Sequence, residues 1–392
     1  MKIAFFGSSI VSAWWNGAAT YYRGLLRELA ALGHDITFYE PAVFERHQHR
    51  DIDDPEWARI VIYAPDDVRR MLHDASDADV IVKASGVGAN DAMLERAVLT
   101  LKRPDNQVIF WDVDAPATLE RLEHDRDDPF RVLVPEYDLV LTYGGGPPVV
   151  AAYEGFGAQR CVPIYNALDR TTHFPVEPDE RFMADLVFIG NRLPDREARV
   201  DEFFFNAAEC SPQRQFLLGG NGWQERAAPV NVRLLGHVYT RDHNAINSSA
   251  LAVLNISRAS MARVGYSPAT RVFEAAGAGA CLITDAWTGI EEFFEPGEEI
   301  LVAECGAEVA DLLNDLTAED ARRIGDAALA RVRADHTYAS RAAEVDALLR
   351  SSPLSLRERA RVRVPSSDNA LYYDRHLETD PHPNPSPEGR GA

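Results

Sequence analysis

Residues 2–39 read KIAFFGSSIVSAWWNGAATYYRGLLRELAALGHDITFY. The stretch opens with the apolar run Lys2–Phe6 and closes with Asp35–Tyr39, and both are typical of β-strands. Between them, from Ala18 to Leu32, apolar side chains recur at helical spacing, and Gly33 follows as a stop signal. We therefore predict a βαβ unit, in which a helix joins two parallel strands.

The same alternation continues through the chain. Further strands of the first half are predicted at Asp79–Lys83, Gln107–Trp111, Asp138–Thr142 and Arg160–Ile164. In the second half they are predicted at Asp185–Ile189, Gln215–Leu218, Val232–Leu234, Leu251–Ile256, Cys281–Thr284 and Ile300–Val302. Helices are expected at about residues 195–209, 240–249, 268–278 and 306–349, and the charged stretch Glu45–Trp57 reads as a loop. This order is typical of parallel sheets covered on both faces.

The length and the breaks in the pattern suggest two domains. At about 150 residues per domain, a chain of 392 residues holds two sizeable units and an additional segment. We predict an α/β fold with two Rossmann-like domains, residues 1–165 and 183–350, whose parallel sheets face each other across a cleft. Residues 166–182 contain prolines and charge and are predicted to be the linker. The proline- and arginine-rich residues 351–392 are predicted to be a disordered tail.

Charge and cysteine content exclude several classes of protein. Lys and Arg number 40 and Asp and Glu 61, giving a net charge of −21 that disfavours nucleic acid and anionic lipid as partners. An anionic ligand therefore needs a local basic pocket. The four cysteines form no Cys-x-x-Cys pair, which predicts neither a disulfide framework nor a zinc site. With no signal peptide and no apolar stretch long enough to cross a membrane, we expect a cytoplasmic protein without an integral membrane segment.

The segment from Gly265 to Glu299, GYSPATRVFEAAGAGACLITDAWTGIEEFFEPGEE, is the most informative for function. Ser267 is a suitable N-cap and Pro268 suits a first helical position, so a helix end with free N–H groups should attract phosphate here. Arg271 and Glu274 then share one helix face, which offers a cation for a diphosphate and a carboxylate for ribose hydroxyls. The simpler alternative is that the two residues form a solvated surface pair.

The run from Arg271 to Glu299 resembles the C-terminal signature of the CgeB/YkvP-type glycosyltransferases of the GT-B superfamily. Weaker similarities lie at Asp138–Thr142 and Leu254–Arg258, and the resemblance spans about residues 1–350. It implies that Glu274 binds the ribose of a nucleoside diphosphate sugar and that Arg192, Arg258 and Arg271 hold its diphosphate. The nucleotide sugar is then a substrate, and no cofactor is expected.

One position departs from the family pattern. Many retaining GT-B enzymes carry a second Glu eight positions before the ribose-binding one, and here Tyr266 occupies that place. The stereochemical outcome therefore stays open. The loop after the first strand, which includes Gly7 and Gly17, is suited to approach a phosphate or an acceptor closely, but it lacks the G-x-G-x-x-G pattern of dehydrogenases.

Two carboxylates are candidates for catalysis. Asp112 and Asp114 follow a predicted parallel strand and should face the cleft, where one of them, preferably Asp114, could take the proton of an acceptor hydroxyl. The alternatives are that Asp114 caps a turn, or that Asp-x-Asp binds a metal as in GT-A enzymes. The tandem Rossmann pattern favours GT-B, in which arginines and a helix end replace the metal, so no metal site is expected.

These observations predict a metal-independent glycosyltransferase that uses a nucleotide-sugar donor. The acceptor is an unidentified sugar, lipid-linked or protein group. A GT-B-shaped sugar-nucleotide epimerase is one alternative. A non-catalytic envelope or spore-surface protein that binds nucleotide sugars is another, since fold alone does not fix function.

Overall fold

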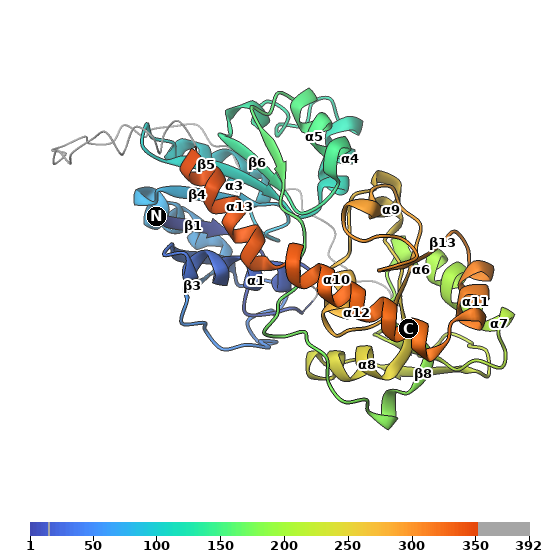
Figure 1. The fold of residues 1–392 in the computed structure, drawn as a ribbon. Helices are drawn as coiled ribbons and strands as arrows, with labels where there is room; N and C mark the ends of the chain where they lie inside the picture. Colours follow the sequence, from blue (N-terminus) through green and yellow to red (C-terminus); the bar gives the residue numbers. More distant parts are fainter. Residues whose placement is uncertain (15, 352–392) are drawn as a thin grey trace.

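The computed structural model describes residues 1–14 and 16–351. The predicted tail, apart from Ser351, lies outside the described residues. Two α/β units follow one another along the chain (Figure 1), each built on a sheet in which every neighbouring pair of strands is parallel. The predicted fold class, with two Rossmann-like units, is confirmed.

The first sheet has seven strands in the order β3-β2-β1-β4-β5-β6-β7. They are β1 (Lys2–Phe6), β2 (Asp35–Pro41), β3 (Ala58–Tyr63), β4 (Val80–Ala84), β5 (Gln107–Asp112), β6 (Leu139–Thr142) and β7 (Cys161–Pro163). The helices of this unit are α1 (Ala19–Ala31), α2 (Val68–Asp74), α3 (Asp91–Ala97), α4 (Ala115–His124) and α5 (Gly146–Gly155). Apolar side chains from both faces of the sheet form two cores, as a sheet covered on both sides requires.

The second sheet has six strands in the order β10-β9-β8-β11-β12-β13. They are β8 (Ala184–Ile189), β9 (Phe216–Gly219), β10 (Val232–Gly236), β11 (Ala250–Asn255), β12 (Leu282–Asp285) and β13 (Leu301–Ala303). The helices are α6 (Pro194–Val200), α7 (Asn206–Cys210), α8 (His243–Ser249), α9 (Ala259–Val264), α10 (Thr270–Gly277), α11 (Gly306–Asp315), α12 (Ala318–Asp335) and α13 (Tyr338–Ser351). A π-helical turn, Asp201–Phe205, joins α6 to α7.

Two sequence-based expectations need correction. Strand β3 was not predicted: it pairs in parallel with β2 at the edge of the first sheet, where its side chains are only partly buried, and it follows the charged stretch 45–57. The single helix expected at 306–349 is three helices. The chain breaks after Asp315, where Thr317 caps α12 by accepting a hydrogen bond from the Asp320 amide (3.1 Å), and again at His336.

Helix α13 returns to the first unit and lies against α1 (Figure 1). The ring of Tyr338 covers Gly24, where an added Cβ would lie 2.1 Å from its Cδ2 atom. Val345 and Leu349 are buried in the same core as α1. The last helix therefore ties the second unit back onto the first.

The carboxyl ends of the two sheets meet. The Gly145 amide, just after β6, donates a hydrogen bond to the Tyr266 carbonyl between α9 and α10 (2.7 Å). Asn166 donates from its side chain to the Pro268 carbonyl (3.3 Å). In parallel α/β sheets, ligands bind beyond the carboxyl ends of the strands, so this junction is where a site is expected.

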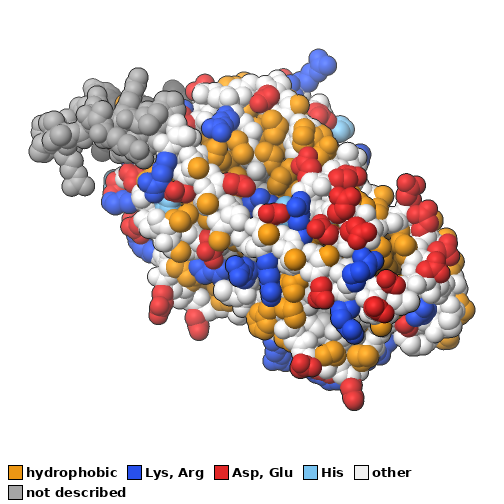
Figure 2. Space-filling view, viewed as in Figure 1, with side chains coloured by type: hydrophobic (Ala, Val, Ile, Leu, Met, Phe, Trp, Pro, Cys, Tyr) orange, Lys and Arg blue, Asp and Glu red, His pale blue; other side chains and the backbone are white. Residues whose placement is uncertain are grey.

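The surface charge is unevenly distributed. On the face shown in Figure 2, acidic side chains gather mainly on the half that holds the second sheet, while arginines and lysines are scattered among apolar patches. No helix within the described ranges is both long and apolar enough to cross a bilayer.

Candidate functional site

A three-residue ion-pair chain joins the two units at the carboxyl ends of their sheets. Arg258, which follows β11, donates through Nε to Asp195 (2.6 Å) and lies 3.4 Å through Nη1 from Asp114, which follows β5. Each side chain is about one third exposed, with fractions of 32, 34 and 37%. The structure thus brings together two predicted site residues, Asp114 and Arg258, that are 144 positions apart.

Asp114 has the environment of a proton acceptor. Its Oδ1 atom is buried and has no hydrogen-bond partner among the described residues. Burial raises the pKa of this carboxyl above its usual value, an effect that Arg258 opposes. Asp114 precedes α4, but its side chain makes no capping hydrogen bond, so the turn-capping alternative does not account for it. This oxygen therefore has an unused acceptor position, which the surrounding atoms cover in this conformation.

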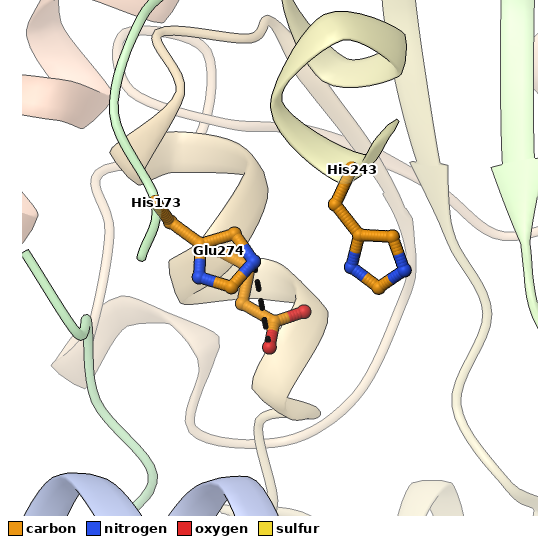
Figure 3. Close-up of side chains that lie close together, drawn as sticks. All are labelled: His173, His243 and Glu274. Atoms are coloured by element: carbon orange, nitrogen blue, oxygen red, sulfur yellow. Dashed lines mark ion pairs between the residues drawn. The ribbon is translucent and has the colours of Figure 1, made fainter. Parts of the chain in front are cut away.

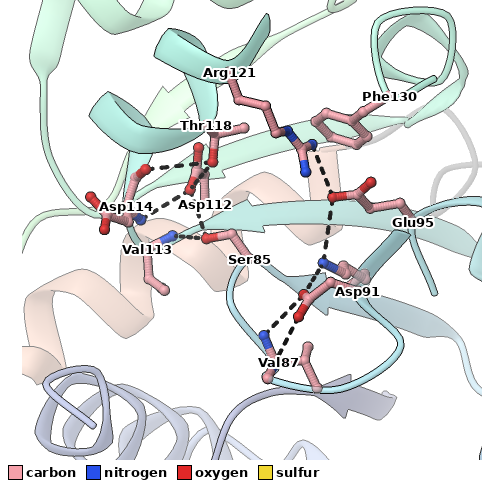
Figure 4. A network of polar contacts seen from close by, with 12 residues as sticks. Ser85, Val87, Asp91, Glu95, Asp112, Val113, Asp114, Thr118, Arg121 and Phe130 are labelled. Carbon is pink, nitrogen blue, oxygen red and sulfur yellow. Dashed lines mark hydrogen bonds and ion pairs between the residues drawn. The ribbon is translucent and has the colours of Figure 1, made fainter. Parts of the chain in front are cut away.

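Asp112 has the opposite environment, as Figure 4 shows. It is fully buried, and its Oδ1 accepts hydrogen bonds from Ser85 Oγ (2.7 Å), the Asp114 amide (3.0 Å) and Thr118 Oγ1 (3.1 Å). Its Oδ2 accepts from the Tyr153 hydroxyl. All the hydrogen-bond donors to Asp112 come from the protein itself, so this carboxylate holds the turn that carries Asp114. In this conformation it does not face an acceptor substrate.

A second polar network supports the same turn from below (Figure 4). Lys83 is completely buried and donates to Asp91 (2.8 Å), with Glu95 at 3.8 Å. Asp91 also accepts from the amides of Val87 and Gly88, which fixes the loop that presents Ser85. Buried charges of this kind are stable only when paired, so the network holds the loop after β4, whose Ser85 in turn contacts Asp112 and Val113 after β5.

In the second unit, two arginines share one aromatic ring. The guanidinium carbons of Arg271 and Arg196 lie 5.2 and 5.5 Å from the ring centre of Phe188, near the carboxyl end of β8. Among the described residues Arg271 makes no hydrogen bond or ion pair, and Arg196 Nε is buried without an acceptor. Burial lowers the pKa of both, that of Arg271 to about 10 with a further contribution from Arg196. Both arginines therefore place a cation beside the Phe188 ring, with donors that an anion can use.

Arg196 was not identified from the sequence. It lies within the charged stretch Arg192–Arg199, in which no spacing distinguishes one arginine from another. The predicted Arg192 is instead paired with Glu197 and approaches the Gly222 carbonyl (3.4 Å). In the described part of the chain Arg192 makes no hydrogen bond or ion pair with another predicted site residue, and Arg196 is the arginine that shares the Phe188 ring with Arg271.

Helix α10 begins later than expected. Its first residue is Thr270 and its N-cap residue is Ala269, whereas Ser267 and Pro268 were predicted to start it. Ser267 is buried, and its hydroxyl donates to the Gly265 carbonyl (2.9 Å). The proposed cap is therefore wrong, and no side chain caps the first turn of α10.

Glu274 lies on α10 beside two histidines (Figure 3). Its Oε1 is 3.9 Å from Nε2 of His173, and its side chain is 16% exposed. His243, the first residue of α8, completes the group. Burial lowers the pKa of His243, while the negative charge of Glu274 acts to raise it. His173 comes from the predicted linker, which has no periodicity that would have indicated its position.

Tyr266, at the position where many retaining enzymes have a second Glu, is part of the contact between the units. It has a left-handed backbone with φ of 46°, which is uncommon for a bulky residue. Its side chain packs against Gly146 and Gly289, where added Cβ atoms would lie 2.6 and 2.1 Å from it. Gly17, the remaining predicted residue, is exposed before α1 and makes no hydrogen bond to the other predicted site residues described in the structure.

The second unit is similar to a known family of proteins. Residues 196–347 match the family model described as glycosyl transferase-like. The chain carries a glycosyl transferase-like domain. No curated protein matches the sequence.

Solved structures share the fold over nearly the whole chain. Anabaena HepE, solved with UDP and glucose, has a TM-score of 0.63 at 16% identity, covering 90% of this chain and 100% of its own. Sucrose-phosphate synthase from Thermosynechococcus elongatus has a TM-score of 0.63 at 15% identity, covering 89% and 98%. An α-glucosyltransferase in complex with UDP-glucose and DNA containing an abasic site has a TM-score of 0.63 at 12% identity, also covering 89% and 98%. The two units of this chain together adopt a GT-B-like fold.

Proposed function

We propose that this protein transfers a glycosyl group from a nucleoside diphosphate sugar to an acceptor hydroxyl. The observation that carries the proposal is that Arg196 and Arg271 both lie against the ring of Phe188 and keep unused donors, in a chain of net charge −21. A diphosphate is a ligand that such a pair recognises. The resemblance of 271–299 to the CgeB/YkvP-type enzymes supports the same assignment.

The roles follow from position. Arg196 and Arg271, with the uncapped first turn of α10, stabilise the charge that develops on the leaving diphosphate. Glu274 accepts hydrogen bonds from the ribose hydroxyls. These groups supply charge stabilisation without a metal, so we propose metal-independent transfer.

Asp114 is proposed as the general base. The acceptor oxygen attacks the anomeric carbon, the bond from that carbon to the diphosphate oxygen breaks, and the acceptor proton moves to the free Oδ1 of Asp114. A carboxyl whose pKa is raised by burial is a better proton acceptor than an ordinary one. Direct attack inverts the anomeric centre, so NMR of the product configuration tests this role. Asp112 acts through Asp114 by holding its turn.

The chemistry of the surface restricts partner and compartment. One structural neighbour was solved with DNA, but a net charge of −21 disfavours DNA as a partner of this chain. A sugar, lipid-linked or protein group remains as the acceptor. Among the described residues all four cysteines are free, which fits a reducing cytoplasm.

Donor binding is the direct test. We expect one of UDP-, GDP-, ADP- and dTDP-glucose to raise the melting temperature, because a ligand of the native state stabilises it by mass action. Glu274→Ala should abolish the shift, since each hydrogen bond to a charged group contributes about 1.5–3 kcal/mol. Glu209→Ala, at an exposed position on α7, is the matched control and should keep it. If no nucleotide sugar in a wider panel stabilises the protein, the proposal fails.

Product analysis then separates transfer from its rivals. Appearance of a glycosylated acceptor with release of the nucleoside diphosphate supports a transferase. Conversion of the donor to its epimer without an acceptor would identify an epimerase. Binding without turnover over a broad acceptor panel would identify a sugar-nucleotide-binding protein.

A further inference from the structure

His173, His243 and Glu274 form a compact cluster that the diphosphate site does not use (Figure 3). One potential ligand atom of each lies within 4.8 Å of the others. The residues come from the segment after β7, the start of α8 and the middle of α10, so three separate elements converge on this point. His173 is 3% exposed, and its Nε2 atom has no hydrogen-bond partner in the described part of the chain.

The hydrogen bonds around His173 are compatible with a proton on Nδ1. Thr172 Oγ1 lies 3.3 Å from the Asp169 carbonyl, to which its hydroxyl can donate. In that arrangement the Thr172 oxygen accepts from Nδ1 of His173, at 2.9 Å. In a neutral ring this leaves a lone pair on Nε2, which faces Glu274 Oε1 at 3.9 Å. A buried nitrogen without a partner that faces a partly buried carboxylate leaves room for a cation between them.

We propose that His173, His243 and Glu274 bind a zinc ion. Two imidazoles and one carboxylate are a ligand set that suits Zn²⁺, whereas Mg²⁺ prefers oxygen ligands alone. Tetrahedral zinc with bonds of about 2.0–2.1 Å places its ligand atoms about 3.3–3.4 Å apart, so the 3.9 Å between His173 and Glu274 shortens by about half an ångström when the ion binds. The widest separation in the cluster, 4.8 Å at most, shortens by more, through rotation of the side chains. The Thr172 contact on Nδ1 supplies the outer hydrogen bond that orients a metal-bound imidazole.

Zinc binding here has a consequence for the donor, and this step rests on the proposed function. Glu274 cannot coordinate Zn²⁺ and accept hydrogen bonds from ribose hydroxyls with the same oxygens. The bound ion therefore opposes donor binding, and the donor weakens zinc binding by the same factor. Zinc is an inhibitor in this scheme, which is compatible with metal-independent transfer.

The metal site is tested first, with tag-free full-length protein, ZnCl₂ alone and isothermal titration calorimetry. We expect one zinc ion per chain, a loss of affinity of more than about tenfold in both His243→Ala and His173→Gln, and no heat with MgCl₂. His237→Ala, which removes an exposed histidine of the same unit, should bind as the wild type does. Because His173 is buried, His243→Ala decides the outcome if His173→Gln fails to fold. Equal zinc affinity in wild type and His243→Ala, or an equal response to magnesium, overturns the site.

The competition is tested with the nucleotide sugar that gives the largest thermal shift. Saturating zinc should raise the apparent Kd of this nucleotide sugar at least about tenfold in the wild type, because zinc and the sugar compete for Glu274 and each weakens the binding of the other by the same factor. In His243→Ala the apparent Kd of the nucleotide sugar should not change when zinc is added. Zinc binding with an unaltered donor Kd would overturn the shared-carboxylate step alone. If no nucleotide sugar binds, the proposed function and this step fall together, while the zinc titration judges the metal site separately.

Discussion

Replacing Arg271 by methionine should weaken donor binding without destabilising the fold. Methionine keeps most of the aliphatic volume and removes the charge. Arg271 has no hydrogen-bond or ion-pair partner among the described residues, and burial lowers its pKa to about 10. A partly buried cation without a partner lowers the stability of the fold, so its removal offsets the loss of the contact with Phe188.

The magnitudes can be set from the contacts. The fold loses the cation–π contact with Phe188, at 5.2 Å, which contributes about 0.5–2 kcal/mol. In return, the variant no longer has to desolvate the charge of Arg271 and no longer places it near the like charge of Arg196. We expect the free energy of unfolding to change by less than about 1 kcal/mol. The donor loses at least one hydrogen bond to a charged group, about 1.5–3 kcal/mol, so its Kd should rise about 10- to 150-fold.

Urea unfolding and calorimetric titration with the best donor measure the two quantities. Arg214→Met is the matched control, because Arg214 pairs with Asp185 (2.9 Å) and the Asn314 carbonyl (3.2 Å) at the amino ends of the strands. It should unfold more easily by about 0.5–2 kcal/mol and bind the donor normally. An Arg271→Met variant that loses more than about 2 kcal/mol of stability and keeps its donor affinity would refute the assignment of Arg271 to the donor.

Three further predictions concern turnover, pH and packing. Asp114→Asn should keep donor affinity but lower kcat by about 10²–10⁴-fold. It should also abolish the acid limb of the pH–rate profile, whose midpoint in the wild type lies above the ordinary pKa of an aspartate because burial raises the pKa of Asp114. An unchanged profile would remove Asp114 as the base. Burial lowers the pKa of His336 to about 4. As the pH falls, this imidazole is therefore protonated in the unfolded chain before it is protonated in the folded one. The free energy of unfolding should fall by up to about 3 kcal/mol as the pH drops from about 6.5 to 4. Urea unfolding across that range should show a weaker dependence in His336→Gln, and parallel curves would contradict the prediction. Gly325→Ala places a Cβ 2.3 Å from the Gly279 carbonyl oxygen and should lower the melting temperature by several degrees. Gly155→Ala is the control, because its added Cβ meets no atom within 4 Å and should leave the melting temperature unchanged. Equal melting temperatures of the two variants would show that α12 can shift.

The strands were predictable because parallel strands buried on both faces are continuous apolar runs. Lys2–Phe6 is a strand with the same bounds in sequence and structure, and Asp138–Thr142 differs from β6 by one residue. β3 escaped prediction because an edge strand is only partly buried and so carries a weaker signal. The late start of α10 shows the limit of capping rules, because the Ser267 hydroxyl found a closer acceptor at Gly265.

The sequence alone determined the doubly repeated α/β architecture and the helix that carries Arg271 and Glu274, because hydrophobic periodicity and helical spacing are local properties. Which charged groups meet was decided only by the tertiary structure. Asp114 and Arg258 come together across 144 positions, and His173 reaches Glu274 from a segment with no periodic pattern. Two aspartates separated by one residue, Asp112 and Asp114, end in opposite environments, one saturated with donors and one with a free oxygen. Burial and partner choice depend on which elements the fold packs together, and neighbouring residues in the chain do not carry that information.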